Sequence, residues 1–211
     1  MASLPDGDGW AAVPDADGAD VVVVRDGGEG WALAEGAIAA PAKALDPTRR
    51  LWSVEVDGAL DPLPGAGARA ADVIAVALGA ESVGVAQRTL EMAVAYAKER
   101  EQFGRPIGAY QAVSHACAQM LLEVEGARSM VLYAAWALDH EPESGPLAAA
   151  MAKAYASDAG WRVPAAALQV HGGIGFTWEH DLHLFLKRAE SNAHAFGDAR
   201  WHREQVAAAL L

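Results

Sequence analysis

Hydrophobic and polar positions change their period near residue 69, which predicts two structural parts. Residues 70–211 are rich in alanine and repeat their apolar positions every three or four residues, the period of an α-helix. Residues 1–69 instead hold short apolar runs between Gly, Pro and Asp clusters, a pattern typical of strands and turns. We therefore expect a partial β-domain over 1–69 and a helical domain over 70–211.

The clearest helical pattern lies between Tyr110 and Asp139, where apolar residues alternate steps of four and three as on a helix packed in a bundle. Further helices are predicted over 70–100, 147–170, 181–190 and 198–211. Two helices of about 30 residues joined by tight turns favour an up-down bundle. The predicted fold class is mainly α, with a C-terminal up-down four-helix bundle after a small, incomplete β-domain.

The same periodicity predicts which residues of the three long helices are buried. On the first helix they are Val73, Val76, Ala80, Val83, Leu90, Val94 and Ala97. On the second they are Val113, Cys117, Met120, Val124, Ala127, Val131, Ala134 and Leu138. On the third they are Leu147, Met151, Ala154, Trp161, Ala165 and Leu168. Asp158 falls on the third stripe, so we interpret it as a buried polar partner for another helix.

The first part of the chain predicts about four strands, few for an independent sheet domain. The runs Val21–Val24 and Trp31–Ala34 flank the turn-forming triplet Asp26-Gly27-Gly28, which predicts a hairpin. Leu51–Val56 alternates apolar and polar residues as a half-buried strand does, and Pro62 and Pro64 then indicate a linker.

Charge and cysteine content narrow the function classes. Lys and Arg total 16 against 28 Asp and Glu, a net charge of −12, which argues against a nucleic-acid or anionic-membrane partner. The single Cys117 excludes a disulfide framework, and no run of about 18 apolar residues predicts a membrane span. We expect a cytoplasmic protein.

Two segments are too unusual for the surface of a generic bundle. Arg100–Ile107, followed by Tyr110-Gln111, joins the first two long helices, and Gln169–Phe176 ends the third. Each combines glycines, which let a ligand approach the backbone, with a nearby cationic or amide side chain. Taken separately, each is equally consistent with a helix-ending loop that has glycine just past the last turn.

Together the two segments resemble signatures of the acyl-CoA dehydrogenase family. Ala97–Ile107 is similar to the signature between the first two C-terminal helices of that family, and Gln169–Phe176 with Trp178-Glu179 is similar to a second one. Leu45–Arg50 is similar to a segment in the β-domain of bacterial members. The resemblance covers essentially the whole chain from residue 10 onward.

The resemblance implies tetramers in which FAD lies between the β-domain and the helical domain, with its adenine end held by a neighbouring subunit. Arg100 and Phe103 would contact the diphosphate and adenine half of that FAD, since a guanidinium pairs well with diphosphate. The implied cofactor-binding residues are Arg100, Gln102, Phe103, Gly104, Ile107, Gln111, Gln169, Val170, Gly172 and Gly173.

The reaction implied is α,β-dehydrogenation of an acyl-CoA thioester, in which a carboxylate removes the α-proton. This chain departs from the family here, because the usual Glu position is occupied by Gly197, and the position used by a second branch is occupied by Ile74. No catalytic residue is therefore predicted. Asp198 is a weak candidate for a shifted base, although we favour an N-cap of the last helix.

Three functions stay open at this point. The chain could be a base-lacking subunit that completes the FAD site of an acyl-CoA dehydrogenase partner, as in bacterial heteromers acting on steroid side chains or other bulky acyl groups. It could be a self-sufficient enzyme with an unrecognised base, or a non-catalytic helical assembly module or degenerate family member. No part of this sequence resembles the N-terminal helical domain of the family. The chain alone is therefore expected not to complete a flavin site.

No metal site is predicted. His180, His183, His194 and His202 are spaced by three, eleven and eight residues, which gives them no shared face. We interpret them as surface histidines and expect to find them exposed.

Overall fold

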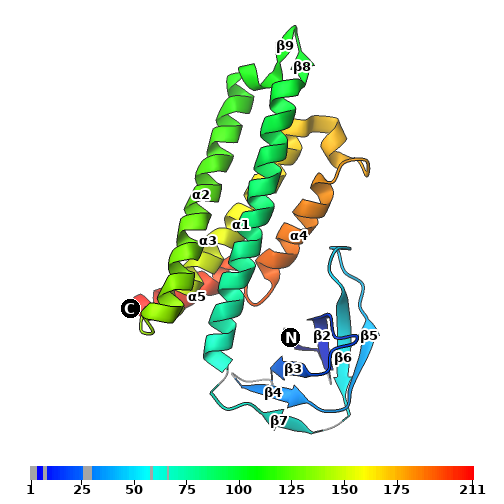
Figure 1. The fold of residues 1–211 in the computed structure, drawn as a ribbon, viewed down its shortest axis with the longest axis vertical. Helices are drawn as coiled ribbons and strands as arrows, with labels where there is room; N and C mark the ends of the chain where they lie inside the picture. Colours follow the sequence, from blue (N-terminus) through cyan, green and yellow to red (C-terminus); the bar gives the residue numbers. More distant parts are fainter. Residues whose placement is uncertain (1–3, 7–8, 26–29, 58, 66) are drawn as a thin grey trace. The chain divides into compact units, whose positions relative to one another are not determined.

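The computed structural model describes residues 4–6, 9–25, 30–57, 59–65 and 67–211 (Figure 1). Tertiary contacts divide the chain into two compact units, Met1–Ala71 and Asp72–Leu211. Each unit has its own hydrophobic core.

The first unit contains two antiparallel sheets. Their strands are β1 (Leu4–Asp6), β2 (Gly9–Pro14), β3 (Val22–Arg25), β4 (Trp31–Ala34), β5 (Ala37–Pro41), β6 (Leu51–Val56) and β7 (Leu60–Pro62). One sheet has the order β1-β2-β6-β5 and the other β3-β4-β7. Val13, Val24 and Val54 are fully buried between them.

The predicted hairpin is confirmed, because β3 pairs with β4 from Val22 opposite Ala34 to Arg25 opposite Trp31. Its turn, 26–29, lies outside the described residues. The predicted strand over Leu51–Val56 is confirmed as β6, the centre of the four-stranded sheet.

The expected total of four strands is wrong, since the described part of the first unit contains seven. The missed strands are short and rich in Ala, Gly and Pro, residues with low strand propensity. They form because neighbouring strands supply pairing partners: β6 for β2 and β5, β4 for β7, and β2 for β1. Pro62, expected in a linker, lies in the edge strand β7, where the missing N–H of proline is tolerated.

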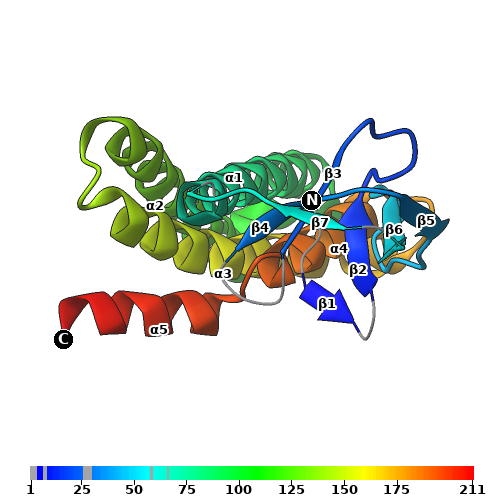
Figure 2. The same cartoon turned by 90° about the horizontal axis from the view of Figure 1, so that it is seen from below.

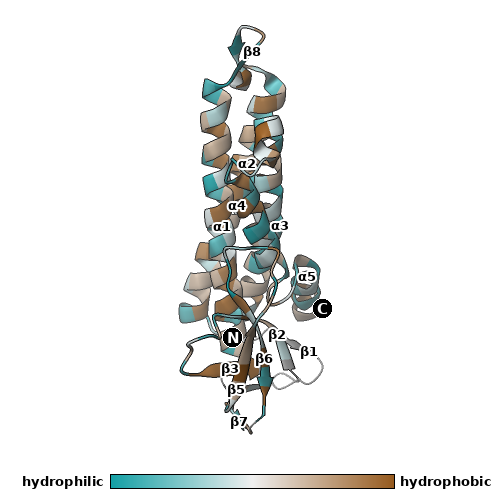
Figure 3. Ribbon diagram, turned by 90° about the vertical axis from the view of Figure 1, so that its right-hand side faces the viewer, coloured by the Kyte–Doolittle hydropathy of each residue, from teal (hydrophilic) through white to brown (hydrophobic). Residues whose placement is uncertain are grey.

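The second unit is the predicted helical bundle. Its helices are α1 (Gly67–Glu99, beginning within the first unit), α2 (Gln111–His140), α3 (Gly145–His171), α4 (Leu182–His194) and α5 (Ala199–Leu210). Helices α1 to α4 run up and down, and α5 packs across α3 (Figures 1 and 2). Apolar and polar bands alternate along α1 and α3 (Figure 3).

The buried stripe predicted for α2 is confirmed over most of its length, because Met120, Val124, Ala127 and Val131 are buried. Along α1 the stripe is correct at Val76, Val83, Leu90 and Ala97. It is wrong at Val73 and Ala80, which are exposed.

The stripe predicted for α3 is wrong at its two largest residues, since Met151 is 42% exposed and Trp161 is 46% exposed. Alanines at 152, 156 and 159 are buried instead. The reason is that α3 packs against α2, α4 and α5 and buries more than one face. Most of its interior positions are therefore filled by small residues, although Leu168 of the predicted stripe is also buried.

Among the described helices, α1 alone is long and apolar enough to cross a membrane, by length and composition only. Of its most apolar window, 44% is buried within the structure. Its residues Val76, Val83 and Leu90 belong to the hydrophobic clusters that also contain α2 and α3 residues.

Candidate functional site

The two unusual segments found in the sequence lie at the same end of the bundle, where α1 and α3 both end (Figure 1). The ring of Tyr96, one turn before Arg100, stacks on the ring of His171, which precedes Gly172. The ring centroids are 4.5 Å apart with 21° between the planes. This stack fastens the end of α1 to the end of α3 and so brings the two segments together.

The first segment is a small hairpin between α1 and α2. Strands β8 (Glu101–Gln102) and β9 (Arg105–Pro106) are joined by Phe103 and Gly104. These loop residues have φ of 52° and 78°, and positive φ at both positions is typical of a type I′ turn. Phenylalanine is uncommon in this conformation, and here its side chain is 92% exposed. A strained, exposed aromatic at a hairpin tip favours a binding role over a packing role.

Tyr110 supports the hairpin from below. Its hydroxyl donates a hydrogen bond to the carbonyl of Gln102 at 3.1 Å, and the Arg105 guanidinium lies 4.1 Å from the centre of its ring. The hairpin leads through η1 (Ile107–Ala109) into α2. In this arrangement Ile107 is half-buried and Gln111, the first residue of α2, is exposed.

The second segment begins with the C-cap of α3 and continues as η2 (Gly172–Phe176). Gly172, with φ of 63°, donates its N–H to the carbonyls of Leu168 and Gln169 and ends the helix. Gly173 differs, because its φ is not positive and a Cβ built there would meet no atom within 4 Å. Neither strain nor packing within this chain requires glycine at 173, so its open backbone is available to a ligand.

Polar side chains without partners accompany this open backbone. Arg100, Gln111 and Gln169 are exposed, and none forms a side-chain hydrogen bond or ion pair within the described chain. Val170, which follows Gln169, is half-buried. Free guanidinium and amide groups next to open glycine backbone fit a diphosphate, which accepts hydrogen bonds from both.

Large apolar side chains also reach solvent at this end. Phe176 is 71% exposed and Trp178 is 79% exposed. Trp178 is held in place by Lys187, whose Nζ lies 4.4 Å from its ring centre, and by an edge contact to His183. The sequence signature includes Phe176 and Trp178, but periodicity predicted no role for them. Clustered exposed aromatics indicate a surface that something else covers.

His171 is a structural histidine. It is buried, and its Nδ1 lies 2.7 Å from the carbonyl oxygen of Ala167. Burial lowers the pKa of His171, so the ring is neutral at pH 7 and suited to stacking on Tyr96. Among the described residues, no group of three or more His, Cys, Asp or Glu side chains is placed to hold a metal ion.

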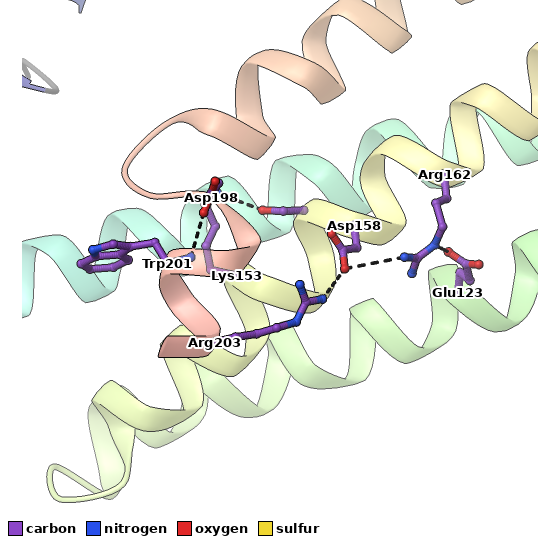
Figure 4. A network of polar contacts seen from close by, with 8 residues as sticks. Glu123, Lys153, Asp158, Arg162, Asp198, Trp201 and Arg203 are labelled. Carbon is purple, nitrogen blue, oxygen red and sulfur yellow. Dashed lines mark hydrogen bonds and ion pairs between the residues drawn. The ribbon is translucent and has the colours of Figure 1, made fainter. Parts of the chain in front are cut away.

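The turn from Ala195 to Asp198 joins α4 to α5 at the opposite end of the bundle (Figure 1). Asp198 is the N-cap of α5, and its Oδ1 accepts a hydrogen bond from the Trp201 N–H at 2.8 Å (Figure 4). The N-cap interpretation is therefore confirmed. This hydrogen bond lowers the pKa of Asp198, and a carboxylate held ionised in this way is a poor proton acceptor.

Asp158 is a polar partner for another helix, as expected, but it is half-buried and not buried. Its carboxylate pairs with Arg203 of α5 and lies 3.6 Å from Arg162 Nη1 on α3. Arg162 Nε donates in turn to Glu123 Oε2 of α2 at 2.8 Å (Figure 4). The network fastens α5 to the bundle.

Residues 69–211 match the family model described as acyl-CoA dehydrogenase, C-terminal domain. The chain belongs to the acyl-CoA dehydrogenase family. It is 40% identical over 190 residues to the acyl-CoA dehydrogenase IpdE2 of Mycolicibacterium smegmatis, with 89% of this chain and 58% of the relative covered. It is 41% identical over 199 residues to the acyl-CoA dehydrogenase FadE34 of Mycobacterium tuberculosis, covering 91% of this chain and 28% of the relative.

Solved acyl-CoA dehydrogenases share the fold of this chain. A chain of the Tcur3481-Tcur3483 steroid ACAD G363A variant superposes with a TM-score of 0.86 at 29% identity, covering 99% of this chain and 61% of that one. The ChsE4-ChsE5 complex of Mycobacterium tuberculosis gives 0.85 at 26% identity, with 99% and 62% covered. The chain thus spans about three fifths of these acyl-CoA dehydrogenase chains.

One feature of this acyl-CoA dehydrogenase chain was missed from its sequence. Lys153 of α3 is 1% exposed, and its ammonium group lies against the turn that holds Gly197. The only signal in the sequence is a lysine in an alanine-rich run with Ser157 one helical turn further on. Periodicity placed Lys153 off the buried stripe of α3, for the same reason that it misplaced Met151 and Trp161.

Proposed function

We propose that this chain is a base-lacking subunit of an FAD-dependent acyl-CoA dehydrogenase and completes the FAD site of a partner subunit. The observation that supports this most directly is the end of the bundle. A strained, exposed hairpin tip at Phe103 lies in the same region as the open backbone of Gly173. Together they form one side of a nucleotide site and leave the other side to a second chain.

Each residue of this end would have a distinct task. Arg100 would pair with the diphosphate, whose oxygens would also approach the backbone at Gly172 and Gly173. Phe103 would pack against the adenine half, and Gln102, Gly104, Ile107, Gln111, Gln169 and Val170 would shape the wall around it. When bound, FAD accepts the β-hydride of the acyl-CoA substrate.

The α-proton would be removed by a base of the partner. Gly197 bears no ionisable group, and Asp198 is engaged as an N-cap. Two similar solved structures are of protein pairs, Tcur3481-Tcur3483 and ChsE4-ChsE5, which is consistent with a hetero-oligomer. We propose an acyl-CoA thioester of fatty-acid or steroid side-chain type as the substrate and the cytoplasm as the location.

Flavin absorption tests this function. The chain is purified alone and after co-expression with a full-length, base-bearing acyl-CoA dehydrogenase, and the flavin-to-protein ratio is compared. We expect flavin only in the co-purified complex, and its loss on Arg100→Ala. Arg200→Ala is the control, because Arg200 is an exposed arginine that pairs with Glu204 on α5. Equal flavin with and without the partner contradicts the proposal.

A second candidate, a non-catalytic assembly module, is favoured by the outer face of α2. Leu122 is 67% exposed, Leu132 is 64% exposed and Trp136 is 48% exposed, and such a stripe is typical of a face that packs on another chain. This candidate predicts a stable oligomer that FAD does not affect and a complex in which Arg100→Ala changes no ligand binding.

A further inference from the structure

The ammonium group of Lys153 joins the end of α4 to the turn that follows it. Lys153 Nζ donates to the carbonyls of Asn192 at 2.9 Å and Gly197 at 3.2 Å, and it lies 3.4 Å from the carbonyl of Ala193. It also donates to Ser157 Oγ at 2.9 Å. The carbonyls of Asn192 and Ala193 belong to the last turn of α4, where helical partners are lacking and the helix dipole is negative.

A buried lysine is costly unless its charge is matched, and here the match is made of backbone oxygens. Burial lowers the pKa of Lys153 to about 8, and the nearby Asp198 carboxylate opposes that shift. The group is therefore mostly protonated at neutral pH and can donate its three N–H groups to the carbonyls of Asn192 and Gly197 and to Ser157 Oγ. Figure 4 shows Lys153 below the loop that carries Asp198.

The turn held by Lys153 includes one position, 197, whose backbone only glycine adopts readily. Gly197 has φ of 93° and the preceding Phe196 has φ of 57°. His202 Nε2 lies 3.1 Å from the Phe196 carbonyl oxygen, so the turn is fixed from α5 as well as from α3. A residue with a side chain at 197 would be strained by the backbone alone.

The space beside Gly197 is also filled. A Cβ at position 197 would lie 2.6 Å from Cε3 of Trp201 and 3.2 Å from Nε2 of His202. The first distance is far below van der Waals contact, and the atom met is part of the indole ring. Trp201 would have to swing away before any side chain could be placed there.

We infer that Lys153 is a positioning residue that locks the turn between α4 and α5 in a glycine-only conformation, and that Trp201 occupies the place of a side chain at position 197. The meaning of this position rests on the proposed function, which assigns the base to the partner. On that assignment, the conformation of the whole turn, and not only the residue type at 197, keeps this chain from supplying a base. A carboxylate introduced at 197 therefore does not act as one.

Thermal unfolding of the full chain tests the closed turn. Gly18→Ala is the matched control, because Gly18 also has a positive φ, 77°, but no atom within 4 Å of its Cβ position. We expect Gly18→Ala to lower Tm by about 3 °C and Gly197→Ala by roughly 6 °C or more. Adding Trp201→Ala to Gly197→Ala should recover the difference. Equal losses at 18 and 197, or no recovery, overturn the inference.

The role of Lys153 is tested by coupling. If Lys153 locks the turn, Lys153→Met and Gly197→Ala together cost less than the sum of their separate losses, because the freed turn relaxes around the new side chain. The control pairs Gly197→Ala with Lys43→Met, an exposed lysine of the first unit, for which the losses should add. Additive losses for both pairs overturn the role of Lys153 as a lock.

An activity measurement separates this inference from the proposed function. Gly197→Glu is introduced into the complex with a partner whose own base is changed to glutamine, and bleaching of the flavin by acyl-CoA is followed without oxygen. We expect flavin-containing complex and no bleaching. Bleaching overturns the inference but leaves the proposed function standing. A complex without flavin overturns the proposed function, while the unfolding data still decide the inference.

Discussion

Tyr96 and His171 stack face to face across the ends of α1 and α3, with ring centroids 4.5 Å apart. Tyr96 lies one helical turn before Arg100, and His171 lies within the second segment directly before Gly172, so the stack sets the spacing between Arg100 and the loop at Gly172. A rigid aromatic pair is a suitable spacer because both rings are held by their helices and lose little freedom on contact.

Breaking this stack should separate the halves of the site. We expect Tyr96→Leu to lower the free energy of unfolding by about 1–2 kcal/mol and to reduce flavin retention in the co-expressed complex. Tyr96→Phe keeps the stack and should retain both properties. Flavin retention unchanged in Tyr96→Leu would show that the two segments do not act together. Urea unfolding and flavin absorption measure the two effects.

Gly173 and Gly175 should respond to alanine in opposite ways, although they lie in the same loop. Gly173→Ala should leave Tm unchanged, because no atom lies within 4 Å of its Cβ position, and should lower flavin retention. Gly175→Ala should lower Tm, because its Cβ would lie 3.1 Å from the Leu168 carbonyl oxygen and from His171 Cβ. Tight flavin binding by Gly173→Ala would exclude close approach of the cofactor at that residue.

A substitution at Phe103 should affect flavin binding without affecting the stability of the chain. Phe103→Gly removes an exposed side chain from a residue with positive φ, so we expect no loss of Tm, since glycine adopts this backbone without strain. Flavin retention in the complex should fall because the adenine half loses its aromatic contact. A clear loss of Tm would mean that the hairpin depends on the phenyl ring for its own stability.

Acid should destabilise the chain through His202. The expectation of a surface histidine is wrong at His202, which lies against the turn after α4 and is only 5% exposed. Burial lowers its pKa from 6.5 to about 4. The unfolded chain then takes up a proton near pH 6.5 that the folded chain refuses until about pH 4. Stability present above pH 6.5 is therefore lost as pH falls through this window, by up to about 3 kcal/mol.

Urea unfolding at several pH values between 7 and 4 measures this loss. His202→Gln should flatten the slope without abolishing it, because burial also lowers the pKa of His171. The Gln variant itself should be somewhat less stable at pH 7, since it changes the hydrogen bond to Phe196. An identical slope in the variant would assign the acid sensitivity to other groups.

Two ion pairs formed by residues of α5 should differ in their contribution to stability. Asp158→Asn removes a half-buried partner shared by Arg162 and Arg203, and we expect α5 to exchange its amide hydrogens faster, with a loss of about 1 kcal/mol. Glu204→Gln, which breaks only an exposed pair with Arg200, should have no measurable effect. Equal exchange in the two variants would show that apolar contacts alone hold α5.

Periodicity predicted the helices well because a helix with one buried face has apolar residues spaced every three or four positions along its sequence. On α2 the alternating stripe from Met120 to Val131 is the buried one. It failed on α3, which packs on several neighbours at once, so Met151 and Trp161 lie outside and alanines lie inside. The short strands of the first unit were missed because partners, rather than their own residues, make them strands.

The candidate site was found through its unusual residue types, while its geometry needed tertiary structure. The segments at Arg100 and Gly172 were identified in the sequence, but their meeting depends on Tyr96 and His171, whose contact no local pattern reveals. Lys153 shows the same limit. Apart from Ser157 Oγ, its acceptors are backbone oxygens some 40 residues away, and no residue type in the sequence marks a backbone oxygen as an acceptor.

In α3 alanine is the commonest buried residue, whereas the large side chains of Met151 and Trp161 are partly exposed. Met151 and Trp161 are 42% and 46% exposed, so substitutions there disturb the interior less than substitutions at the buried alanines would. A duplicated copy of this chain can thus gain a different partner protein through substitutions at exposed residues of α3, while the buried alanines keep the distances between the helices.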